Sequence, residues 1–183
     1  MKVLMVCTGN ICRSPMAEVM LREELGKRGC SGIEVASAGT WAGSGQPAMP
    51  EARRAMSGRG VDLEAHRSRP VTVEEVAEAD LVVAMTSVHV RELKEVAEDV
   101  GTKMVLMKEL VEIELGEPSG DDLDARLRSL LEGKRPEPRR ALDLDDPMGL
   151  PAFAYERAAS EIAAGVEVLA DLLCGSEARE ESA

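Results

Sequence analysis

The stretch Cys7-Thr8-Gly9-Asn10-Ile11-Cys12-Arg13-Ser14-Pro15 decides how the rest of the chain is organised. Residues 3–6 before it are apolar and typical of a buried strand, and residues 16–25 after it carry apolar side chains at helical spacing. Pro15 suits the first turn of a helix, where its missing N–H is not needed. The sequence therefore predicts a strand, a tight loop and a helix, with the loop N–H groups forming an anion-binding nest.

Three side chains in this stretch predict its chemistry. A thiol surrounded by amide N–H groups at a helix N-terminus is favoured as a thiolate, so Cys7 is a candidate nucleophile. The planar fork of Arg13 suits two phosphate oxygens. The hydroxyl of Ser14 can hydrogen-bond the thiolate and ease its later departure as a leaving group. Together these groups describe a nucleophile aimed at a phosphorus atom held by its equatorial oxygens.

With its continuation into Met16-Ala17-Glu18, the stretch resembles the signature of the low-molecular-weight protein-tyrosine phosphatase family. The resemblance implies a three-layer αβα fold, with a four-stranded parallel sheet in the order 2-1-3-4 and a phosphate-binding loop after the first strand. It implies hydrolysis of a phosphorylated protein through a phosphocysteine intermediate on Cys7, with Arg13 binding the phosphate and no metal or cofactor. The implied phosphate- and substrate-binding residues are Thr8, Gly9, Asn10, Ile11, Cys12 and Ser14, and Trp41 is added as a candidate from its position after the second strand.

The remaining chain alternates strand and helix patterns, which independently predicts a parallel α/β sheet. Strands are expected at residues 33–37, 81–85 and 103–106. Helices are expected at 51–60, from Thr72 onward, and at 87–99, 121–132 and 152–173. The resulting prediction is a single domain over residues 1–174, with an insertion around 114–140 and a disordered tail at 175–183.

Composition limits the possible partners. The chain has 183 residues and a net charge of −12, which argues against general affinity for nucleic acid or an acidic membrane. An anionic substrate therefore needs a local positive site, and Arg13 provides one. No metal-ligand spacing is visible around the two histidines, His66 and His89. The sequence leaves the oligomeric state open.

Location is predicted from the lack of targeting signals and from the cysteines. No apolar run is long enough to span a membrane, and the first residues read as a strand rather than a signal peptide. Four cysteines do not make a disulfide scaffold in a chain of this size. These features favour a reducing cytoplasm.

Two further segments are candidates for the site. Trp41 follows the second strand and is either one wall of the substrate cleft or a surface-packed tryptophan. The family resemblance places His66 in a hydrogen-bond network with Asn10, Ser14 and Ser37, which would hold the loop in shape and tune the thiolate.

The acid that protonates the leaving group is expected on the loop Asp145-Asp146-Pro147-Met148-Gly149. The family places this acid before a proline, which selects Asp146, with Asp145 as the alternative by position. The sequence departs from the common tyrosine-phosphatase pattern here, because Met148 and Gly149 replace the aromatic residues that usually follow. The short acid loop resembles that of protein-arginine phosphatases.

Ile11 points instead to phosphotyrosine. The arginine-phosphatase branch carries threonine at this loop position, whereas isoleucine is typical of tyrosine phosphatases and suits the flank of an aromatic ring. Hydrolysis of phosphotyrosine is therefore the favoured function, protein-arginine phosphatase the second, and a non-catalytic module that binds phosphorylated ligands the third. Cys12 either traps Cys7 as a reversible disulfide under oxidation or simply packs within the loop.

Overall fold

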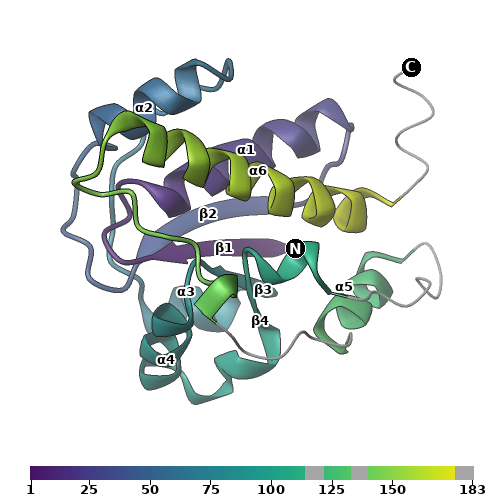
Figure 1. Ribbon diagram of the computed structural model, residues 1–183. Helices are drawn as coiled ribbons and strands as arrows, with labels where there is room; N and C mark the ends of the chain where they lie inside the picture. The colour runs from purple at the N-terminus through teal and green to yellow at the C-terminus, as the bar shows by residue number, and fades with distance from the viewer. Residues whose placement is uncertain (114–121, 133–139, 176–183) are drawn as a thin grey trace.

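A four-stranded parallel sheet forms the centre of the molecule (Figure 1). The computed structural model describes residues 1–113, 122–132 and 140–175. The strands are β1 (Lys2–Cys7), β2 (Glu34–Gly39), β3 (Leu81–Ala84) and β4 (Met104–Leu106). Their order is β2-β1-β3-β4, and each neighbouring pair is parallel. The predicted fold class and strand order are confirmed.

Helices cover both faces of this sheet (Figure 1). One layer holds α1 (Arg13–Lys27), α2 (Pro50–Ser57) and α6 (Ala152–Cys174), and the other holds α3 (Val73–Glu78) and α4 (Ser87–Val96). Along β1, Val3 and Met5 pack in the core shared with α1 and α6, whereas Leu4 and Val6 pack in the core on the opposite face. Burial on both faces explains why the strands read as continuous apolar runs.

One predicted helix ends earlier than expected. The pattern predicted a helix to residue 99, but α4 ends at Val96 and a short 3₁₀ helix, η1 (Glu98–Lys103), follows. Between them Ala97 adopts an extended conformation, with φ −148°. Val100 is buried in the core beneath α4, so the chain turns inward to bury it before entering β4.

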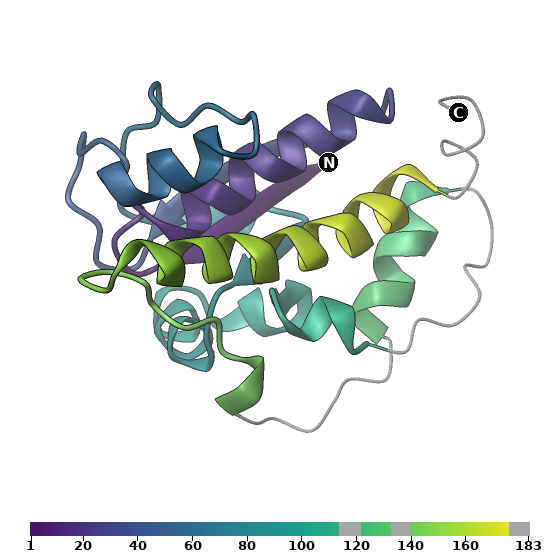
Figure 2. The ribbon, with the colours of Figure 1, turned by 45° about the horizontal axis from the view of Figure 1, so that its top comes forward.

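The helix predicted at residues 121–132, within the predicted insertion, is confirmed. This helix, α5 (Leu123–Glu132), buries Leu130 and packs three further leucines against the main core. Figure 2 shows it beside the C-terminal part of α6. The 3₁₀ helices η2 (Glu109–Val111) and η3 (Arg140–Leu142) lie on either side of it in sequence. The rest of the insertion and most of the predicted tail lie outside the described residues.

Two of the four cysteines form a disulfide that the sequence did not predict. Cys30 and Cys174 form a disulfide that joins the turn after α1 to the end of α6. The sequence predicted no disulfide scaffold and did not indicate this single pair, because only the fold brings residues 144 positions apart together. Cys7 and Cys12 are free and buried. None of the described helices is long and apolar enough to cross a membrane.

Candidate active site

The connection from β1 to α1 lies where an open α/β sheet places its ligands. Cys7 is the last residue of β1 and Arg13 is the first residue of α1. The chain passes from β1 to β2 on one side and later to β3 on the other, so the order of strands reverses at β1. Ligands bind at such a switch point, outside the carboxyl ends of the strands. Both side chains are buried, with 2% of Cys7 and 3% of Arg13 exposed.

The loop between these residues turns its carbonyl oxygens outward. Asn10 has φ 51°, in the left-handed region that asparagine tolerates better than most residues. Four loop carbonyls, those of Cys7, Thr8, Asn10 and Ile11, are bonded respectively to Thr40 N, Trp41 N, His66 Nε2 and Met49 N at 2.7–2.9 Å. With these oxygens held from outside, the N–H groups of the loop are left to face an anion.

Gly39, at the end of β2, packs directly against this loop. A Cβ atom there would lie 2.4 Å from the Thr8 carbonyl oxygen and 2.9 Å from the Asn10 nitrogen. Both atoms belong to the backbone, so neither can move without changing the loop. A residue without a side chain is therefore required for the loop to keep this shape.

The predicted network around Asn10 is present. The Asn10 Nδ2 group donates to Ser14 Oγ at 3.0 Å and to Ser37 Oγ at 2.8 Å. Its Oδ1 accepts the Arg69 backbone N–H at 3.0 Å. His66 joins through its ring Nε2, which lies 2.7 Å from the Asn10 carbonyl oxygen rather than from the asparagine side chain. The structure thus brings together all four residues that the resemblance grouped.

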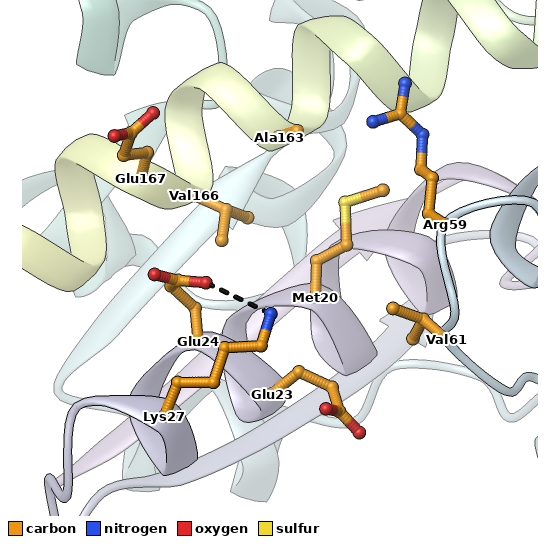
Figure 3. A pocket seen from close by; sticks show the side chains of 9 residues that line it. All are labelled: Met20, Glu23, Glu24, Lys27, Arg59, Val61, Ala163, Val166 and Glu167. Atoms are coloured by element: carbon orange, nitrogen blue, oxygen red, sulfur yellow. Dashed lines mark ion pairs between the residues drawn. The ribbon is translucent and has the colours of Figure 1, made fainter. Parts of the chain in front are cut away.

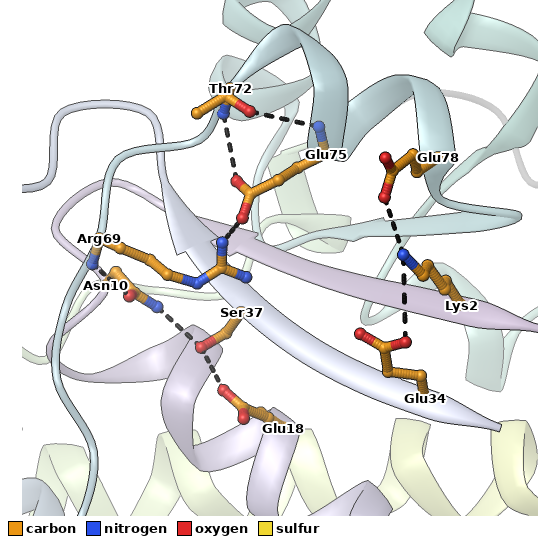
Figure 4. A network of polar contacts seen from close by, with 9 residues as sticks. All are labelled: Lys2, Asn10, Glu18, Glu34, Ser37, Arg69, Thr72, Glu75 and Glu78. Atoms are coloured by element: carbon orange, nitrogen blue, oxygen red, sulfur yellow. Dashed lines mark hydrogen bonds and ion pairs between the residues drawn. The ribbon is translucent and has the colours of Figure 1, made fainter.

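Glu18 fixes the direction of the hydrogen bonds in this network (Figure 4). Its carboxylate, 2.5 Å from Ser37 Oγ, can only accept, so Ser37 donates to it and receives a hydrogen bond from Asn10. Ser14 likewise accepts from Asn10. Its own proton is then left for Cys7 Sγ at 3.0 Å or the Ala38 carbonyl at 3.3 Å. A thiolate is the stronger acceptor, so the network directs a donor at the sulfur.

The Arg13 guanidinium contacts the segment from Leu144 to Asp146. Its Nη1 donates to the Leu144 carbonyl at 3.0 Å, and its Nη2 contacts Asp146 Oδ2 at 2.5 Å. Its Nε is buried without a hydrogen-bond partner in the described part of the chain. A buried donor of this kind is costly unless something accepts from it, and a bound oxyanion would do so.

The two candidate acids occupy different surroundings. Asp146 lies against Arg13, and its Oδ1 also accepts the Met148 N–H at 3.1 Å. Asp145 pairs instead with Arg157 at 2.9 Å, and its side chain is 75% exposed. The geometry therefore brings Asp146, and not Asp145, to the loop from Cys7 to Arg13.

Trp41 lies at the rim of the site. The residue is 75% exposed, its backbone N–H donates to the Thr8 carbonyl, and its indole Nε1 donates to Glu92 Oε1 at 2.8 Å. In the described part of the chain after Asp146, the large hydrophobic residues that are exposed are Met148, Leu150 and Phe153.

Two buried groups near the loop have shifted pKa values. Burial and the nearby Cys7 raise the pKa of the Cys12 thiol to about 12, so Cys12 stays protonated. Burial, and then the positive charge of Arg13, lower the pKa of His89 to about 4, so its imidazole is neutral at pH 7. His89 contacts the Thr8 hydroxyl through Nε2 at 2.9 Å.

Sequence reasoning missed three residues around this site: Glu18, His89 and Glu92. Glu18 had a readable signal, because it lies one helical turn after Ser14 and so shares its helix face. His89 and Glu92 had none, since only the packing of α4 beside the loop brings them there.

A cavity elsewhere in the molecule is not part of this site. It has a volume of about 360 Å³ and lies between the second half of α1 and α6 (Figure 3). Its walls include Met20, Glu23 and Val166, and it has no residue in common with the loop from Cys7 to Pro15. Among the described residues, no group of three or more His, Cys, Asp or Glu side chains is arranged to hold a metal ion.

Comparison with known proteins identifies relatives of this chain. The segment from residue 2 to residue 121 matches the family described as "Low molecular weight phosphotyrosine protein phosphatase". The "Probable low molecular weight protein-tyrosine-phosphatase EpsP" of Ralstonia nicotianae is 42% identical over 92 residues, which cover 50% of this chain and 60% of that protein. The "Protein-arginine-phosphatase" of Geobacillus stearothermophilus is 31% identical over 172 residues, covering 94% of this chain and 95% of the relative.

A solved structure gives the same assignment. The low molecular weight protein tyrosine phosphatase from T. tengcongensis superposes with a TM-score of 0.72 at 32% identity, covering 92% of this chain and 97% of that chain. The agreement of sequence and fold leaves one conclusion: the chain belongs to the low molecular weight phosphotyrosine protein phosphatase family.

Proposed function

We propose that the protein is a protein-tyrosine phosphatase that hydrolyses phosphotyrosine through a phosphocysteine, without a metal ion. One arrangement carries the proposal. A buried thiol and a buried guanidinium lie at the two ends of an anion-binding loop, and a carboxylate from a distant segment meets the guanidinium. A module that only binds phosphorylated ligands needs neither the thiol nor the carboxylic acid.

In the first step the Cys7 thiolate attacks phosphorus, and the bond from phosphorus to the tyrosyl oxygen breaks. Protonated Asp146 gives its proton to the departing oxygen. The loop N–H groups and Arg13 hold the three equatorial oxygens and stabilise the charge that develops on them. A bound phosphate competes with Asp146 for the Arg13 guanidinium and so frees the carboxyl group to face the leaving group.

In the second step Asp146, now a carboxylate, takes a proton from a water molecule. The resulting hydroxide oxygen attacks phosphorus, the sulfur–phosphorus bond breaks, and inorganic phosphate leaves. The Ser14 hydroxyl, 3.0 Å from Cys7 Sγ, donates to the sulfur as it departs as a thiolate. Each group returns to its starting protonation state, so no external acid, base or metal is needed.

The choice of phosphotyrosine rests on Ile11 and Trp41. An apolar side chain in the loop and an exposed indole at the rim both suit a flat aromatic ring. Protein-arginine phosphatase is the second candidate, favoured by the short acid loop and by the similarity to the Geobacillus enzyme over 94% of this chain. We also propose that the substrate is a phosphorylated protein and that the location is the cytoplasm, where Cys30 and Cys174 would be held reduced except under oxidising conditions.

Catalysis is tested with p-nitrophenyl phosphate. We expect the wild-type protein to release phosphate in the presence of EDTA, and Cys7→Ser to release none. Acid-quenched wild-type protein should carry phosphate on Cys7. Equal release from both proteins, or none from either, would remove the enzymatic proposal and leave the binding module.

Substrate choice is tested with two peptides of one sequence, carrying phosphotyrosine or phosphoarginine. We expect wild type to prefer phosphotyrosine and Ile11→Thr to shift toward phosphoarginine. Ile11→Val is the matched control, because valine has the shape of threonine without its hydroxyl. A wild-type preference for phosphoarginine would make the second candidate correct.

A further inference from the structure

One face of α4 contacts both loops that border the site. The helix begins after β3, at the same end of the sheet as the loop from Cys7 to Arg13 (Figure 1). His89 and Glu92 are three residues apart in this helix and therefore share a face. His89 reaches the loop after β1, and Glu92 reaches the loop after β2.

The His89 ring is fully engaged by two hydroxyl groups. Its Nε2 lies 2.9 Å from Thr8 Oγ1, and its Nδ1 lies 3.0 Å from Thr86 Oγ1. Thr86 is the N-cap residue of α4, and its hydroxyl also accepts the His89 backbone N–H. Only 2% of His89 is exposed. The phosphate-binding loop is thus tied, through one buried ring, to the start of a helix.

Glu92 holds the second loop in the same way. Its Oε1 accepts the Trp41 indole N–H at 2.8 Å, although Trp41 is 75% exposed. The Trp41 backbone N–H donates to the Thr8 carbonyl at 2.9 Å, so the two loops are also bonded to each other. An exposed tryptophan with a fixed edge offers a flat ring in a defined orientation.

We propose that His89 and Glu92 are positioning residues of this site, His89 fixing the phosphate-binding loop through Thr8 and Glu92 fixing the Trp41 ring that borders the substrate. The proposal rests on the proposed function but assigns the two residues separate effects. His89 acts on phosphate binding and turnover, because Thr8 directly follows the nucleophile. Glu92 acts on the part of the substrate beyond the phosphate, because Trp41 lies at the rim.

The His89 bond is tested with p-nitrophenyl phosphate and inorganic phosphate. We expect His89→Leu to lower kcat and to weaken inhibition by inorganic phosphate, each about tenfold, because the hydrogen bond between His89 and Thr8 is lost. His89→Gln, whose amide can reach Thr8, should recover most of both. Thr8→Val removes the same bond from the exposed side and serves if His89→Leu does not fold.

A double-mutant cycle tests whether these losses come from the hydrogen bond between Thr8 and His89. The double variant Thr8→Val/His89→Leu should be no worse than either single variant, because both changes remove one interaction. Arg91→Gln, an exposed change on the same helix, is the control and should match wild type. Wild-type kinetics in both single variants, or fully additive losses, would overturn the assignment of His89.

The Glu92 bond is tested by fluorescence, because Trp41 is the single tryptophan of the chain. We expect Glu92→Ala to increase acrylamide quenching and to raise KM for p-nitrophenyl phosphate about threefold, with inhibition by inorganic phosphate unchanged. Glu92→Gln keeps an acceptor for the indole and should stay near wild type, as should the exposed control Glu95→Gln. Unchanged quenching in Glu92→Ala would overturn the assignment of Glu92.

These readouts separate this inference from the proposed function. Binding of inorganic phosphate, followed by calorimetry, and quenching of Trp41 require no turnover. If the wild-type protein hydrolyses nothing while the variants still shift phosphate binding and quenching as described, the positioning roles stand and the phosphatase proposal falls.

Discussion

The guanidinium of Arg13 meets the carboxylate of Asp146, with 2.5 Å between Nη2 and Oδ2, across 133 positions of the chain. Arg13 is the fixed partner, because only 4% of its side chain is exposed, against 43% for Asp146. The contact joins the residue that would bind phosphate to the residue that would protonate the leaving group. Asp146 therefore already lies at the loop before any substrate arrives.

Asp146→Asn tests the acid role through the leaving group. We expect turnover of phenyl phosphate, whose leaving group needs a proton, to fall roughly 10²–10³-fold, and turnover of p-nitrophenyl phosphate to fall much less. Asparagine keeps an acceptor for the Met148 N–H, so the loop should retain its turn. Asp145→Asn is the matched control and should resemble wild type. Equal losses on both substrates, or a larger loss in Asp145→Asn, would assign the acid elsewhere.

Asn10→Asp tests the direction of the hydrogen bonds around the sulfur. A carboxylate can still accept from Arg69 N but cannot donate to Ser14 or Ser37, so two buried bonds are lost. We expect kcat to fall by about 10–100-fold and the free energy of unfolding to drop by about 2 kcal/mol. Ser37→Ala removes the bonds that Ser37 makes with Asn10 and Glu18 but leaves the bond from Asn10 to Ser14, so it should lower kcat less. If Asn10→Asp and Ser37→Ala lower kcat equally, the network does not act through Ser14.

His89 predicts a specific loss of stability in acid. Its pKa is lowered from 6.5 to about 4, so the folded protein binds fewer protons than the unfolded chain between these values. The stabilising effect of the neutral ring is present above 6.5 and is lost as the pH falls toward 4.

The measurement is urea unfolding of wild type and His89→Gln. Between about pH 7.5 and pH 5, the wild-type free energy of unfolding should fall by about 2 kcal/mol more than that of the variant. Carboxylates titrate in both proteins and cancel in the difference. Parallel pH profiles would mean that His89 is not held in its neutral form.

The disulfide between Cys30 and Cys174 predicts a stability that depends on reductant. It closes a loop between residues 144 positions apart, so its reduction should lower the free energy of unfolding by about 2–4 kcal/mol. Phosphatase activity should be unchanged, because the 15-residue helix α1 separates the disulfide from the loop by about 20 Å. The variant Cys30→Ser/Cys174→Ser should be as stable as reduced wild type and insensitive to dithiothreitol. Equal stability of oxidised and reduced wild type would contradict the prediction.

Local patterns determined a large part of this protein. The apolar runs, the helical spacing and the glycines set the strands and most helix boundaries, because each depends on residues close together in sequence. The loop from Cys7 to Pro15 could be read in the same way, since nucleophile, anion nest and arginine occupy consecutive positions. Thr72 caps the helix that was expected from this position onward, with Glu75 completing the capping box.

Only the tertiary structure decided the contacts made across long separations. The sequence already favoured Asp146 over Asp145, and the structure adds that Asp146 faces Arg13 whereas Asp145 faces Arg157. The roles of Glu92 and His89 depend on where α4 packs, and the disulfide depends on where α6 ends. None of these contacts leaves a periodic signal, because periodicity reports which face of an element is buried and not which distant residue covers it.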